Sequence, residues 1–143
     1  MRAAYELRAL VDERVAAVRT KDLDTLVRQQ HPDIVTFDVV PPLASRGRDA
    51  AAERTRDWFD GYPDGIGYEV QHLDAHAWGD LGWCSFVYRV TGILREGREV
   101  DMWVRATVCW RRDDEGWRIV HEHESVPFDP ETGAAQLGLA PTI

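Results

Sequence analysis

Cysteine is scarce in this chain of 143 residues, which contains only Cys84 and Cys109. Two cysteines cannot build the disulfide framework of a small secreted domain, and they lack the repeated spacing of a structural zinc site. The expected state of both is a reduced, buried thiol, as in a cytoplasmic protein. The sequence carries no signature of a metal or cofactor, and we expect neither.

Long apolar runs and an excess of positive charge are missing too. Residues 1–20 carry a charge every few positions, so they resemble neither a leader peptide nor a membrane-spanning segment. The formal net charge of −8 disfavours binding to a nucleic-acid backbone or to an anionic membrane. We therefore expect a cytoplasmic protein with no nucleic-acid or membrane partner.

The composition that remains is typical of one globular domain. Hydrophobic residues make up 44% of the chain and charged residues 29%, which a single core of this size can accommodate. No repeat or linker divides the sequence. We predict one domain over residues 1–143, with its core at about 5–128 and a C-terminal tail at 129–143.

The first third of the chain predicts three helices. Apolar residues recur at helical spacing from Leu7 to Val18, and Arg14 lies inside that apolar stripe. A short second helix is predicted to end near His31-Pro32. A third is predicted to begin at an Asp49 N-cap and to end at Gly61.

The pattern then changes to the period of two that is typical of strands. One strand is predicted at residues 33–40, before the third helix, and four more follow it at 66–78, 81–95, 98–112 and 117–127. Helices followed by an antiparallel meander predict an α+β fold, with the helices packed on one face of a curved sheet. The cone-shaped space between the two layers is the expected site for a small molecule.

The turn at Glu96-Gly97 decides which side chains face this cone. A two-residue turn would place Cys84 opposite Cys109 and would turn Arg89 to the same face as Val108. Both faces of this hairpin would then be largely apolar, which indicates that the outer face is covered as well. We predict a homodimer that packs sheet on sheet.

The last hairpin leaves two orientations open. A loop of four residues would turn His121 and His123 to the same face as Val108, whereas a loop of three or five would turn Glu122 and Glu124 there. The sequence does not fix the length of this loop, so strand pairing alone does not decide between the two orientations.

Three stretches resemble a known superfamily: "TFDVVPPLASRG" (residues 36–47), "VYRVTG" (87–92) and "W…GWRIVHEHES" (110–125). Over residues 5–128 the chain is similar to the nuclear transport factor 2-like superfamily, in its SnoaL-like and ketosteroid isomerase-like branch. The last two stretches are also similar to the association domain of calcium/calmodulin-dependent kinases. The resemblance implies the cystatin-like α+β cone, but the superfamily includes isomerases, dehydratases, cyclases, epoxide hydrolases and non-catalytic assembly domains.

The resemblance to ketosteroid isomerases implies functional positions. Their catalytic aspartate ends the first strand, and Asp38 holds that place here. Arg14 falls where those enzymes have a tyrosine that donates to the substrate oxyanion. Their second, acidic donor falls on or beside Val108, so steroid isomerisation by that mechanism is not expected.

The similarity to the kinase association domain bears on the other side of the cone. It aligns Arg89 with a pocket arginine, and it turns Glu122 and Glu124 inward. His121 and His123 would then face outward, toward the predicted dimer partner.

The resulting hypothesis is cofactor-independent acid/base chemistry on a small, mostly apolar molecule. Asp38 would be the general base, because desolvation raises the pKa of a carboxylate toward neutral pH. Arg14 and Arg89 would stabilise developing negative charge. Glu122 or Glu124 would serve as acid or orienting partner. Trp58 and Trp83 would line the cone as apolar walls.

Structural alternatives exist for the same residues. The arginines and glutamates can form an ion network in a non-catalytic binding or assembly domain. Asp38 can cap the third helix or pair with Arg46 or Arg48. His121 and His123 can chelate a metal, although a buried place in a dimer interface is the favoured interpretation.

Overall fold

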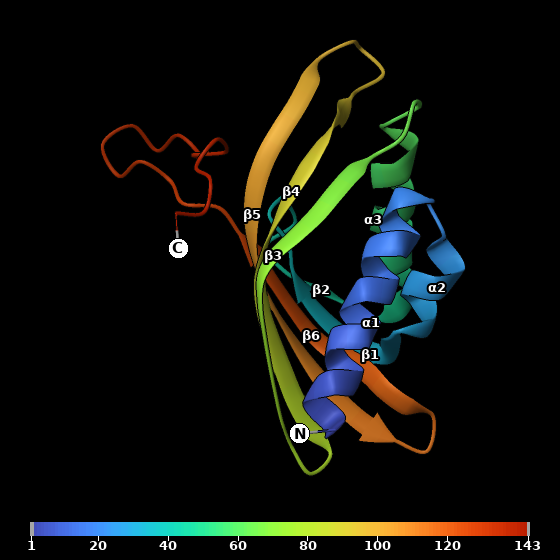
Figure 1. The fold of residues 1–143 in the computed structure, drawn as a ribbon. Helices are drawn as coiled ribbons and strands as arrows, with labels where there is room; N and C mark the ends of the chain where they lie inside the picture. Colours follow the sequence, from blue (N-terminus) through green and yellow to red (C-terminus); the bar gives the residue numbers. More distant parts are fainter. Residues whose placement is uncertain (1, 143) are drawn as a thin grey trace.

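The computed structural model describes residues 2–142 as three helices packed on one side of a curved sheet (Figure 1). The helices are α1 (Arg2–Arg19), α2 (Leu23–Arg28) and α3 (Arg48–Asp60). The strands are β1 (Gln30–Phe37), β2 (Ser45–Arg46), β3 (Gly67–Trp78), β4 (Leu81–Ile93), β5 (Glu99–Asp113) and β6 (Gly116–Ser125). The predicted α+β architecture is confirmed. None of the helices in residues 2–142 has the length and apolar character needed to cross a membrane.

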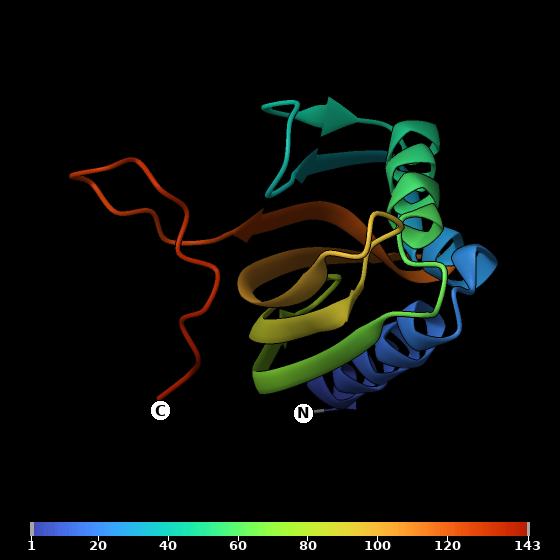
Figure 2. The same ribbon diagram turned by 90° about the horizontal axis from the view of Figure 1, so that it is seen from above.

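The six strands form one sheet in the order β2-β1-β6-β5-β4-β3. Strands β3 to β6 form the predicted antiparallel meander. Strand β1 joins β6 in parallel, so the sheet is mixed rather than purely antiparallel. Strands β2 and β3 are its two edges, so the sheet curves around the helices without closing into a barrel (Figure 2).

Two predicted boundaries in the first third are wrong. Helix α2 ends at Arg28 and strand β1 runs from Gln30 to Phe37, so the His31-Pro32 pair lies inside the strand, whereas the short helix was predicted to end near it and the strand to span 33–40. The N-cap of α3 is Gly47, at a left-handed φ of 98°, and not Asp49. Asp49 lies instead in the first turn of α3, where its negative charge interacts favourably with the helix dipole and stabilises the helix.

The β4–β5 turn differs from the prediction by one residue. The Leu94 N–H donates to the Arg98 carbonyl at 2.9 Å, which leaves a three-residue turn with Gly97 at a φ of 92°. A shift of one residue turns every side chain of β4 to the opposite face relative to β5. Cys84 therefore pairs with Val108, and the predicted pair of Cys84 with Cys109 is wrong.

The corrected register gives each face of the β4–β5 hairpin its own character. The concave face toward the helices is apolar and buried: Cys84, Phe86, Tyr88, Val90, Val104, Ala106 and Val108. The convex face carries Trp83, Val87, Arg89, Trp103, Arg105 and Cys109. Buried and more exposed side chains thus alternate more regularly along these strands than the two-residue turn implied.

Helix α1 packs closely on β4 at Gly82. A Cβ atom at this position would lie 2.7 Å from Leu7 Cδ1 and 2.9 Å from the His76 carbonyl oxygen. Leu7 is fully buried, so it has little room to move. The glycine therefore sets the distance between helix and sheet.

We expect Gly82→Ala to lower the free energy of unfolding by about 1–3 kcal/mol, because the added methyl group overpacks this contact. Urea denaturation measures the change. Gly138→Ala is the matched control, since no atom lies within 4 Å of its Cβ position, and it should stay within about 0.5 kcal/mol. Equal stability of the two variants would contradict the close packing.

The C-terminal segment lies on the side of the sheet away from the helices (Figure 1). It doubles back on itself, with Phe128 bridged to Ala135, and then contacts β5 near the start of that strand. There the Trp103 N–H donates to the Leu137 carbonyl at 2.9 Å. The tail is thus attached to the sheet and stays away from the concave face.

Candidate functional site

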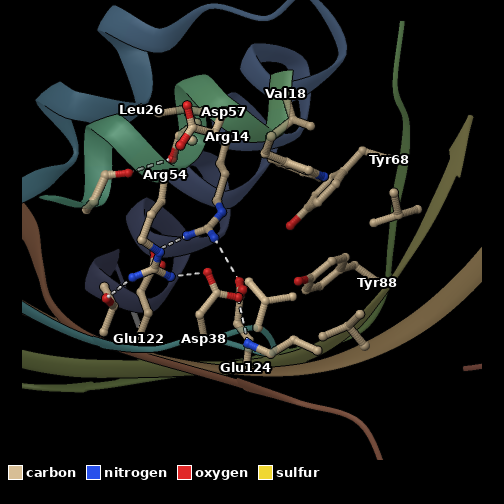
Figure 3. Close-up of a pocket in the computed structure, with 18 of the residues that line it drawn as sticks. Arg14, Val18, Leu26, Asp38, Arg54, Asp57, Tyr68, Tyr88, Glu122 and Glu124 are labelled. Atoms are coloured by element: carbon tan, nitrogen blue, oxygen red, sulfur yellow. Dashed lines mark hydrogen bonds and ion pairs between the residues drawn. The ribbon is translucent and has the colours of Figure 1, made fainter. Parts of the chain in front are cut away.

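A cavity of about 540 Å³ lies between the concave face of the sheet and the helices (Figure 3). This volume is within the range of small-molecule sites. Its apolar walls come from the three helices and from the sheet: Val18, Leu26, Ala51, Trp58, Val90, Met102, Val104 and Ile119. Its charged side chains are Arg14, Asp38, Arg54, Asp57, Glu122 and Glu124.

Arg14 points from α1 into the cavity, and it binds two glutamates of β6. It donates to Glu122 through Nη1 and to Glu124 through Nη2, the latter at 3.2 Å. All three side chains are only 12–14% exposed. Burial alone would lower the pKa of Arg14, but attraction to Glu122 and Glu124 leaves it well above its ordinary value.

Glu124 is the group of this cluster that titrates near neutral pH. Burial raises its pKa to about 7, and the negative charges of Glu122 and Asp38 act in the same direction. Arg14 and the nearby Tyr88 hydroxyl oppose the shift. A carboxyl group with such a pKa can both donate and accept a proton at neutral pH.

Tyr68 of β3 and Tyr88 of β4 form the wall next to these glutamates. Their rings stack with centroids 4.8 Å apart, and their hydroxyls point into the cavity (Figure 3). Burial raises the pKa of both phenols, so their hydroxyls stay protonated and can donate hydrogen bonds. Neither tyrosine was predicted as a site residue.

Asp38 follows directly after β1 and is held at the cavity by α3. Arg54 donates to Asp38 through Nη2 and to Thr36 Oγ1 through Nη1, the latter at 3.0 Å. The Val39 N–H donates to the other carboxylate oxygen of Asp38 at 2.6 Å. The partner of Asp38 is therefore Arg54, and not Arg46 or Arg48 as the structural alternative proposed.

Two of the predicted site residues lie outside the cavity. Arg89 is on the convex face, where its Nε and Nη2 each donate to an Asp101 carboxylate oxygen at 2.8 Å. Trp83 is on the same face and stacks on His76, with ring centroids 4.6 Å apart. Both predictions are wrong for one reason: the three-residue turn reverses the faces of β4, the strand that carries both residues, relative to β5. Trp58 does line the cavity.

The last hairpin has the orientation in which the glutamates face inward. Glu122 pairs with Val108, and a register shift between Cys109 and Trp110 sets this alternation. His121 and His123 point outward and pack edge-on against Phe37, at 4.8 and 5.5 Å between ring centroids. Within residues 2–142, no group of three or more histidine, cysteine or acidic side chains could hold a metal ion.

Several solved structures are similar to this chain. An NTF2-like protein of unknown function from Pseudomonas putida KT2440 is 31% identical over 97% of this chain and 96% of its own, with a TM-score of 0.88. A ketosteroid isomerase-like protein from Erwinia carotovora atroseptica is 18% identical over 82% of this chain and 91% of its own (TM-score 0.69). A proposed calcium/calmodulin-dependent protein kinase II association domain from Xanthomonas campestris is 21% identical over 89% and 88% (TM-score 0.74).

The cone with a cavity on its concave face defines the class, that of NTF2-like proteins. Residues 7–129 match the family model of the SnoaL-like domain, and the chain belongs to that family. The two structures below 25% identity support the fold alone. No curated protein matches the sequence.

Proposed function

We propose that this protein is an enzyme that performs cofactor-independent general acid/base chemistry on a small, mostly apolar molecule. The reaction would be of the isomerase, cyclase, dehydratase or epoxide-hydrolase type. The observation that carries the proposal is Glu124, a buried carboxyl group with a pKa near 7 in a cavity with apolar walls. Perturbed acids of this kind are concentrated at active sites.

In this mechanism the two carboxyl groups divide the proton transfers. Asp38 would accept a proton from the substrate, and Glu124, whose pKa near 7 allows both forms at neutral pH, would take up or deliver the second proton. The hydroxyls of Tyr68 and Tyr88 would donate to an oxygen that gains negative charge. Arg14 would position Glu124 rather than contact the substrate, since its terminal nitrogens already bind Glu122 and Glu124.

The test begins with the compounds that co-purify with the protein, which mass spectrometry can identify and which supply substrate candidates. For a substrate so found, Asp38→Asn is expected to lower kcat by about 10²–10⁴-fold. The fold should persist, because the amide oxygen can still accept from Arg54. Asp101→Asn on the convex face is the control and should retain activity. Unchanged turnover by Asp38→Asn would remove this residue from the mechanism.

A non-catalytic binding or assembly domain is the second candidate, and one observation favours it. Both guanidinium groups that line the cavity already bind carboxylates, Arg14 with Glu122 and Glu124, and Arg54 with Asp38. Such pairs can serve structure alone. A ring of many subunits in light scattering, without turnover of any co-purified compound, would favour this candidate.

We propose a homodimer as the assembly of the enzyme. The convex face presents Trp83, Val87 and Trp103, which are only half-buried in the single chain. Packing of this face on a second copy would cover them. Light scattering should then give twice the mass of the 16.3 kDa chain.

A further inference from the structure

The cavity is unbalanced in charge. Four carboxylates line it, namely Asp38, Asp57, Glu122 and Glu124, against the two guanidinium groups of Arg14 and Arg54. With all six groups ionised, the negative charges exceed the positive ones by two. Asp57 is exposed, and among the other five groups the excess is one negative charge. The whole chain has a net charge of −8, which also raises the local concentration of cations.

The guanidinium groups offer little to an anion. The terminal nitrogens of Arg14 bind Glu122 and Glu124, and those of Arg54 bind Asp38 and Thr36. Arg54 Nε has no acceptor among residues 2–142, but it is buried and out of reach of a ligand. A carboxylate or phosphate group in the cavity would therefore face mainly negative charge at short range, which is costly in a poorly solvated site.

Aromatic rings supply the complementary surface. Tyr68 and Tyr88 stack side by side on the wall, and Trp58 packs edge-on against Tyr68 with ring centroids 6.3 Å apart. The hydroxyls of Tyr68 and Tyr88 point into the cavity, and the partial negative charge of their oxygens attracts an alkylammonium group. The same side chains also offer apolar surface to the body of a ligand.

We propose that this cavity selects cations: its ligand is a small molecule with an apolar body and one positively charged nitrogen, an amine or a quaternary ammonium. This inference rests on the proposed function and narrows its substrate class. The apolar body would lie against Val90, Met102 and Val104, and the nitrogen would lie between the tyrosines and the acidic side chains.

Binding of such a ligand should be coupled to a proton. Glu124 faces Arg14 of α1, Tyr68 of β3, Tyr88 of β4 and Glu122 of β6, together with Asp38 beyond β1. A cation placed among these groups favours the ionised form of Glu124 and lowers its pKa. The carboxyl group should therefore release its proton when the cation binds, and affinity should rise with pH around neutrality.

Three probes that share one ring system test the charge preference. They are the cation (1-naphthylmethyl)trimethylammonium, the neutral alcohol 1-naphthalenemethanol and the carboxylate 1-naphthaleneacetate. Isothermal titration calorimetry at pH 8 should show the ammonium binding at least tenfold more tightly than the alcohol, with no detectable binding of the carboxylate. Lowering the pH to 6 should weaken the binding of the ammonium by up to about tenfold and leave the affinity for the alcohol unchanged. The permanent charge of the ammonium ensures that any proton released comes from the protein.

Titrations in buffers of different ionisation enthalpy count the protons. We expect nearly one proton released per ammonium bound at pH 6 and almost none at pH 8.5. Glu124→Gln should abolish the release and the pH dependence, whereas Glu99→Gln, exposed at the start of β5, should retain both. The comparison of probes on the unaltered protein needs no variant, so it holds even where Glu124→Gln folds poorly.

The outcomes separate the two proposals. Binding of the alcohol or the carboxylate as tight as that of the ammonium would overturn cation selection and leave the proposed enzyme standing. Failure of all three probes to bind, together with the absence of any co-purified compound, would overturn both. Ammonium binding without proton release would overturn the placement of the charged nitrogen beside Glu124.

Discussion

Replacement of Glu124 with glutamine is expected to lower kcat on an identified substrate by about 10²–10⁴-fold, the usual contribution of a general acid or base. Glutamine keeps the size and the hydrogen bond to Arg14, but it cannot carry the proton. The pH–rate profile should lose its ionisation near pH 7, because burial beside Glu122 and Asp38 places the pKa of Glu124 there. Steady-state kinetics from pH 5 to 9 measure both effects, with Glu99→Gln as the control.

The same variant also tests the pKa of Glu124 without a substrate. The folded protein holds the proton of Glu124 up to about pH 7, whereas the unfolded chain loses it near 4.5. The group therefore contributes stability that is fully present below pH 4.5 and is lost as the pH rises through 7, by about 3 kcal/mol in total. Relative to the unaltered protein, Glu124→Gln should gain this amount between pH 4.5 and pH 8. A difference that does not change with pH would show that Glu124 titrates normally.

Substitution of Arg14 with methionine is expected to lower the free energy of unfolding by about 3–5 kcal/mol at pH 8, because it leaves two buried carboxylates without their cation. Glu122 and Glu124 are each at most 14% exposed, so water cannot replace the lost partner. At pH 5 the loss should be smaller, since Glu124, with a pKa of about 7, is then protonated. Urea denaturation at both pH values measures it.

Arg89→Met is the matched control for this prediction. Arg89 also binds a carboxylate, that of Asp101, but the pair lies exposed on the convex face. Exposed ion pairs contribute little, so the urea midpoint should hardly move. If the two variants were equally stable, the buried cluster at Arg14 would not depend on its arginine.

Much of this fold could be predicted from sequence periodicity. The change from helical spacing to a period of two gave the order of helices and meander strands, because each period reflects which side chains face the core. Arg14 could be found by the same means, as a charge inside an apolar stripe. Arg54 lies in an equivalent position on α3, between Ala51 and Trp58, and this signal was overlooked.

The rest depended on turn lengths that composition does not fix. Glu96-Gly97 is compatible with a two-residue or a three-residue turn, because a left-handed glycine suits both. A two-residue type I′ turn would also need a positive φ at Glu96, which that residue does not have. The extra turn residue moves Arg89 out of the cavity and Tyr88 into it. The inward direction of Glu122 depends likewise on the register shift between Cys109 and Trp110, and no turn residue in the sequence predicts that shift.

The attachment of the tail to β5 bears on the solubility of the protein. Strand β6 pairs with β5 only as far as Arg105, so the residues of β5 before it would have a free edge on that side. A free edge is a template on which a strand of another molecule can add, which is a route to aggregation. Because the Leu137 carbonyl accepts from Trp103 at this edge, the tail occupies the position that such a strand would take. The segment around Leu137 thus protects the sheet from unwanted pairing.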